Sequence, residues 1–128
     1  MPGWLAVAVG GALGSMARYW ASGWAAAAFG ETFPFGTLIV NVTGSFIIGL
    51  FATLTGPDGR FLVEPQWRAF VMVGICGGYT TFSSFSLQTL NLLRDGEHAY
   101  AAGNVLLSVS LCMLGVWLGH VTAVAINR

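Results

Sequence analysis

The sequence predicts an all-α integral membrane protein with four transmembrane helices, the third of them broken at its centre. Hydrophobic residues make up 55% of the 128 residues and charged residues only 8%, whereas a soluble domain carries about 25% charged residues. Mean hydropathy is +0.74. A membrane-spanning helix needs roughly 20 apolar residues. We therefore expect residues 1–128 to form a single four-helix transmembrane domain without an appended soluble domain.

The first predicted span covers residues 4–29 and the second covers residues 37–55. The segment GETFPFG between them predicts a turn, with Pro34 near the start of the next helix. No basic segment precedes the first span, and Arg18 interrupts its apolar residues, so we do not expect a cleaved signal peptide.

The third predicted span covers residues 67–93 and the fourth covers residues 100–126, joined by the polar connector RDGEH. The segment GPDG is a strong turn signal and opens the longest loop, which ends at Pro65. Because an even number of spans returns the chain to its starting side, both termini and this loop are expected on the same side of the membrane.

The positive charges give only a weak preference for one orientation. Arg60, Arg68 and Arg128 fall on the side of the termini, and Arg94 falls on the other. Since basic residues mark the cytoplasmic side, this small difference favours insertion in both orientations and antiparallel pairing of two copies. A dimer is the simplest symmetric assembly.

Small residues spaced four apart let membrane helices approach closely. Such pairs occur in all four predicted spans: Gly10 and Gly14, Gly11 and Ser15, Ser45 and Gly49, Gly74 and Gly78, Gly115 and Gly119. We expect these faces to pack the helices against one another and against a second copy.

Several function classes are excluded by composition. Net charge is zero, so no overall field attracts nucleic acid. The histidines His98 and His120 have no partner signature, no acid lies inside a span, and no phosphate-binding or nucleophile motif occurs. Cys76 and Cys112 lie in apolar stretches without metal-ligand spacing and are expected to be small buried hydrophobes. An enzyme is therefore not expected.

Polar residues inside the spans are the functional candidates, since lipid makes them costly. Thr37, Asn41 and Ser45 repeat every four residues on the second span, which places them on one helix face. Hydrogen bonding between helices and lining of a pore are the two interpretations, and the two amide donors of Asn41 favour the pore. A second such series, Asn104, Ser108 and Cys112, lies on the fourth span, where both interpretations stay open.

The segment GICGGYTTFSSFS predicts the break in the third span. Gly77 and Gly78 permit unusual backbone dihedrals, and irregular backbone at membrane depth must be buried in protein or line a polar cavity. The freed carbonyls suit a hard cation. Phe82 and Phe85 would project from one face, where ring edges can face an anion. Arg18, the one charge deep in a span, would be structural or contribute positive potential to a vestibule.

Three segments carry a resemblance to a known family. GGALGSMARYW (10–20), GTLIVNVTGSFIIG (36–49) and GGYTTFSSFS (77–86) resemble the signature segments of the CrcB/Fluc fluoride channels. The third segment is highly specific, and only the fourth span matches loosely. The resemblance implies an antiparallel dual-topology homodimer in the inner (plasma) membrane, with two pores through which fluoride leaves the cell passively.

The resemblance also implies roles for individual residues. Asn41 would line the pore, Phe82 of one subunit and Phe85 of the other would offer ring edges to fluoride, and Ser108 would belong to a polar track. Thr81 and Ser84 would add hydroxyl groups nearby. The backbone carbonyls of Gly77 and Thr80 from both subunits would hold a structural sodium ion.

Two rival functions remain. A small multidrug transporter has similar length and topology but needs a carboxylate within the membrane, which no span here contains. An accessory membrane subunit would use the polar residues only to hold helices together.

Overall fold

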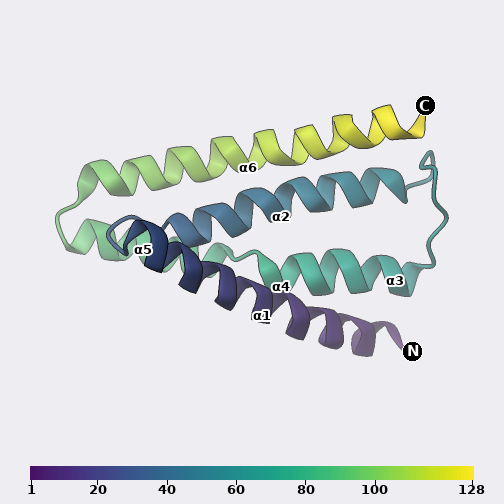
Figure 1. Ribbon diagram of the computed structural model, residues 1–128, viewed down its shortest axis with the longest axis horizontal. Helices are drawn as coiled ribbons and strands as arrows, with labels where there is room; N and C mark the ends of the chain where they lie inside the picture. The colour runs from purple at the N-terminus through teal and green to yellow at the C-terminus, as the bar shows by residue number, and fades with distance from the viewer.

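The computed structural model describes residues 1–128, and all of its regular structure is helical (Figure 1). The three long helices are α1 (Gly3–Phe29), α2 (Phe35–Leu54) and α6 (His98–Asn127). Four shorter elements follow one another between α2 and α6, namely α3 (Pro65–Ala69), the π-helix η1 (Phe70–Cys76), α4 (Gly77–Tyr79) and α5 (Phe82–Arg94). The predicted span limits are thus confirmed to within a few residues.

Three of the four expected spans are long and apolar enough to cross a membrane: Phe35–Leu54, Pro65–Arg94 and His98–Asn127. The helix α1 is long enough as well, but it does not reach the same apolarity, because it contains Arg18, two serines and five glycines. The passage of α1 through the membrane therefore stays a prediction.

Both termini lie at one end of the bundle, together with the long loop between α2 and α3 (Figure 1). Two arginines at this end hold helix C-termini. Arg60 donates to the carbonyl of Ile126 at 3.1 Å, and Arg68 donates to the hydroxyl of Thr55 at 2.9 Å and to the carbonyl of Ala52. Positive groups at helix C-termini offset the partial negative charge of the unpaired carbonyls.

The helices α2 and α6 run side by side along most of their length (Figure 1). Glycine makes this approach possible: a Cβ atom at Gly119 would lie 2.2 Å from the carbonyl oxygen of Phe46, and one at Gly49 would lie 2.3 Å from that of Val116. Close contact of this kind replaces the hydrophobic drive that lipid removes. The prediction that small-residue pairs pack helices together is confirmed within this chain.

Close contact through glycine also packs α1 against η1 and α4. A Cβ atom at Gly14 would lie 2.1 Å from the carbonyl oxygen of Ile75, and one at Gly78 would lie 2.6 Å from that of Gly11. The broken span therefore packs directly on α1, and this packing determines where its central carbonyls lie.

The third span is broken at its centre, as expected, but the glycines do not make the break. Gly77 has α-helical dihedrals (φ −64°, ψ −37°), and neither it nor Gly78 has a positive φ. The chain becomes extended at Thr80 (φ −92°, ψ 159°) and Thr81 (φ −154°, ψ 118°). The expected role of the glycine dihedrals is therefore wrong. β-Branched residues accept extended backbone readily, whereas Gly78 serves the close approach to α1.

The π-helix η1 lies immediately before α4 and was not expected from the sequence. A π-helix pairs each N–H with the carbonyl five residues earlier; such segments are rare and occur frequently at functional sites. This rare element therefore lies directly before the break in the third span.

Candidate functional site

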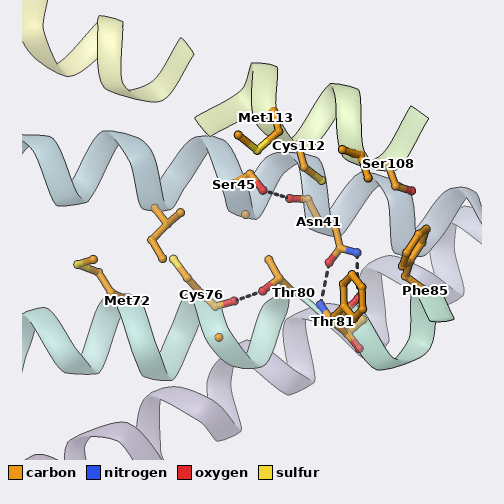
Figure 2. Close-up of a pocket in the computed structure, with 15 residues that line it drawn as sticks. Asn41, Ser45, Met72, Cys76, Thr80, Thr81, Phe85, Ser108, Cys112 and Met113 are labelled. Carbon is orange, nitrogen blue, oxygen red and sulfur yellow. Dashed lines mark hydrogen bonds between the residues drawn. The ribbon is translucent and has the colours of Figure 1, made fainter. Parts of the chain in front are cut away.

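A cavity of about 380 Å³ opens beside the break, between α2, α6 and the broken span (Figure 2). Seven of the predicted site residues line it, namely Asn41, Gly77, Thr80, Thr81, Phe82, Phe85 and Ser108. Ser84 and Arg18 lie outside its lining. Residues from three separate parts of the chain therefore meet in one space.

Asn41 holds the extended backbone of Thr81 with both ends of its amide group. Its Oδ1 accepts the N–H of Thr81 at 2.7 Å, and its Nδ2 donates to the carbonyl of Thr81 at 3.0 Å (Figure 2). The partner of the Asn41 amide is not its own helix but the break, which exposes a backbone N–H and C=O to it. One N–H of Nδ2 remains for a ligand.

Two carbonyls at the break have lost their helical donors. In a continuous helix the N–H of Thr81 would bond to the carbonyl of Gly77, and that of Ser84 to the carbonyl of Thr80. Here Thr81 donates to Asn41, and Ser84 donates to the hydroxyl of Thr81 at 3.1 Å, which caps α5. The carbonyls of Gly77 and Thr80 are thus deprived of their usual partners. Carbonyl oxygens of this kind are suitable ligands for a hard cation.

Arg18 reaches the break from α1. Its Nε donates to the carbonyl of Gly78 at 3.0 Å, and its side chain is half-buried. This carbonyl would otherwise pair with the N–H of Phe82, which begins the next helix. The bond assigns Arg18 a structural contact with an unpaired carbonyl, one of the roles proposed for it from the sequence.

Phe82 and Phe85 lie next to each other at the start of α5, with ring centroids 5.4 Å apart and planes inclined by 53°. The two rings differ in burial: Phe82 is 77% exposed, whereas Phe85 is 9% exposed. The exposed ring of Phe82 leaves apolar surface beside the cavity, which lipid or a second copy of the chain would cover.

The hydroxyl groups that line the cavity donate hydrogen bonds to neighbouring acceptors within the chain. Ser45 donates to the carbonyl of Asn41 at 2.7 Å, and Thr80 donates to that of Cys76 at 2.9 Å (Figure 2). The expected series on α2 is also divided, since Thr37 is buried away from this cavity. Cys76 and Cys112 are both free thiols in the lining. The prediction that they are buried is confirmed for Cys76, whereas Cys112 is half-buried.

Sequence reasoning named Asn104 but missed its partner, Thr89. Asn104 is 1% exposed and donates to the hydroxyl of Thr89 on α5 at 2.9 Å. Thr89 lies four residues after Phe85, on the same face of the helix, and this spacing could have identified it.

The chain matches known proteins over almost its whole length. Residues 5–120 match the family described as CrcB-like protein, Camphor Resistance (CrcB). Among curated relatives, a protein of Rhodospirillum rubrum is 64% identical over 125 residues, covering 98% of this chain and 97% of the relative. A protein of Opitutus terrae is 63% identical over 124 residues, covering 97% of this chain and 94% of the relative. Both are named fluoride-specific ion channel FluC.

A third relative of that name, from Methylocella silvestris, is 58% identical over 125 residues, covering 98% of this chain and 95% of the relative. These relatives are ion channels by name and not enzymes or multidrug transporters. With its membrane-spanning helices and its match at this level of identity, the chain belongs to the CrcB-like family, the family of the fluoride-specific ion channels FluC.

Proposed function

We propose that the protein is a fluoride-selective channel through which fluoride leaves the cell passively across the inner (plasma) membrane. The observation that carries this proposal is the identity of 64% and 63% to proteins named fluoride-specific ion channels. The cavity beside the break supports it, because residues that can serve as donors to a small anion are present there and no formal charge is among them.

Conduction requires sites that bind an ion and also release it. The free N–H of Asn41 and the positive edges of the Phe82 and Phe85 rings are weak, fixed donors that can replace water around fluoride. The hydroxyl of Ser108 would continue the path along α6, and those of Thr81 and Ser84 would lie near its start. A lysine or arginine in the narrow part would hold fluoride too strongly.

The functional unit would be an antiparallel homodimer with two pores. The exposure of Phe82 and the open side of the cavity support this proposal, since a second copy would cover both. Phe82 of one subunit would then face fluoride together with the partner's Phe85. A reporter fused to the C-terminus should be active on both sides of the membrane; a signal from one side alone would refute dual topology.

A sodium ion would have a structural role at the centre of the dimer. The fit is supported by the carbonyls of Gly77 and Thr80, whose helical donors are engaged elsewhere. Two carbonyls from each copy would supply oxygen ligands, as a hard monovalent cation requires.

The decisive experiment uses liposomes loaded with potassium fluoride. On addition of valinomycin, a fluoride electrode should record rapid efflux from vesicles that contain the protein, and chloride-loaded vesicles should retain their anion. No fluoride loss would favour an accessory membrane subunit. Proton-coupled export of a cationic drug would favour a small multidrug transporter.

A further inference from the structure

The helix α5 carries Phe82 and Phe85, yet few contacts hold it to the rest of the chain. It packs mainly on α6 and touches α2 only slightly. Two side chains supply the hydrogen bonds that join α5 and its cap to other helices. Asn41 binds the backbone of Thr81 at the start of α5, and Asn104 binds Thr89 further along it.

The bonds of Asn104 form a directed series that runs from the cavity to α5. The hydroxyl of Ser108 donates to Oδ1 of Asn104 at 3.3 Å, and Nδ2 of Asn104 donates to Thr89 at 2.9 Å. The hydroxyl of Thr89 in turn donates a hydrogen bond to the carbonyl of Phe85 at 2.8 Å. The proton of the Ser108 hydroxyl therefore points toward Asn104 and not into the cavity.

Asn104 itself is not placed to touch an ion. Its side chain is 1% exposed, and it is absent from the cavity lining, to which Ser108 and Phe85 belong. Its amide oxygen is bonded to Ser108, which lines the cavity, and its amide nitrogen to Thr89, which does not. Asn104 therefore contacts the residues around the cavity and not the cavity itself.

We infer that Asn104 is a positioning residue for fluoride conduction: through Thr89 it holds α5, which carries Phe82 and Phe85, against α6. The inference rests on the proposed channel function. Interhelical hydrogen bonds in membranes are individually modest, but α5 has few others, so the loss of one displaces Phe85 from the wall.

The test is a set of variants at both ends of the Asn104–Thr89 bond, assayed by fluoride efflux from liposomes. Thr89→Val removes the acceptor with almost no change in volume, and Asn104→Leu removes the donor. Each should slow fluoride efflux by about fivefold to tenfold, as expected for the loss of one such bond. The double variant should be no slower than Asn104→Leu alone, because Asn104→Leu has already removed the bond to Thr89.

Two control variants separate positioning from general disturbance. Thr89→Ser keeps the hydroxyl and should conduct within about twofold of the parent, since the bond is retained. Thr122→Val makes the same chemical change on α6, where the hydroxyl bonds only to the carbonyl of Leu118 in its own helix. It should leave efflux unchanged. Normal efflux with Thr89→Val but slow efflux with Asn104→Leu would overturn the inference, because Asn104 would then act without Thr89.

A second measurement does not depend on conduction. A ¹⁹F-labelled phenylalanine at position 85 should change its NMR resonance when Thr89→Val is introduced and keep it with Thr122→Val. An unchanged resonance with Thr89→Val would refute the positioning role even if Asn104→Leu failed to fold. Absence of efflux from the unsubstituted protein would instead refute the channel function, so the two failures are distinguishable.

Discussion

Asn41 combines two tasks in one amide group. Its oxygen and one of its N–H bonds hold the backbone of Thr81, and its second N–H is left for an anion. The sequence predicted a polar contact at this position from the spacing of Thr37, Asn41 and Ser45. It did not predict the partner, because the free backbone of Thr81 exists only where the third span breaks.

Replacing Asn41 with aspartate tests both tasks at once. Asn41→Asp removes both N–H donors and introduces a negative charge, so it opposes an anion and loses the bond to the Thr81 carbonyl. Fluoride efflux should fall by at least about tenfold, in line with a penalty of 1–3 kcal/mol for an unsatisfied buried group. Asn91→Asp, an exposed position on α5, is the matched control, and equal efflux from both variants would refute the assignment.

Cys112 offers a direct test of the cavity as a pathway. Its thiol is half-buried in the lining beside Ser108, so a small cationic methanethiosulfonate should reach it and obstruct fluoride. Efflux should slow after treatment of the parent protein. Cys112→Ser should conduct at least as well as the parent, because a hydroxyl is the better donor, and should resist the reagent. Retained sensitivity would place the reactive thiol elsewhere.

Among the helices, the limits of the spans were predictable and the geometry of the break was not. Apolar runs, GPDG and RDGEH gave the ends to within a few residues, because turn chemistry is local. The break was assigned to Gly77 and Gly78 from their conformational freedom, yet it lies at Thr80 and Thr81. That outcome depends on α1, which requires Gly78 for contact, and on Asn41, which holds the extended segment. Both are contacts between distant parts of the chain.

Helix contact through glycine makes a prediction for stability. Gly119→Ala would bring a Cβ atom to 2.2 Å from the Phe46 carbonyl oxygen and 2.8 Å from the Leu50 nitrogen, which forces α2 and α6 apart. Overpacking of this kind costs about 1–3 kcal/mol, so the Tm in detergent should fall. Gly103→Ala on the same helix meets nothing within 4 Å and should leave the Tm unchanged or raise it. Equal Tm values for the two variants would contradict this account.

For the whole molecule, the sequence predicted a membrane protein, and the structure contains three helices able to span. The arrangement of a second copy could not be derived from one chain, because the interface depends on contacts absent from a monomer. The exposed ring of Phe82 is the main indication of where such a copy would lie.

A structural sodium ion at the dimer centre makes a prediction for the assembled protein. Binding to the folded state alone raises stability in proportion to the logarithm of ligand concentration. The Tm should therefore rise when N-methylglucamine is exchanged for Na⁺ at constant ionic strength. Thr80→Val retains the carbonyl and should keep this dependence. A Tm that is identical in both salts would remove the ion from the proposal.

The seven residues of η1 have a consequence for how this family can vary in length. Each residue of an α-helix advances the chain by about 100° around its axis. In an α-helix the loss of one residue therefore rotates everything downstream by about that angle. A π-helical turn holds about one residue more than an α-helical turn, so deleting one residue between Phe70 and Cys76 would let the segment adopt the commoner winding and leave Thr81 and both benzyl rings facing nearly the same way. A scan of single-codon deletions should therefore find η1 more tolerant than the α-helical part of the same span, measured as folded and conducting protein.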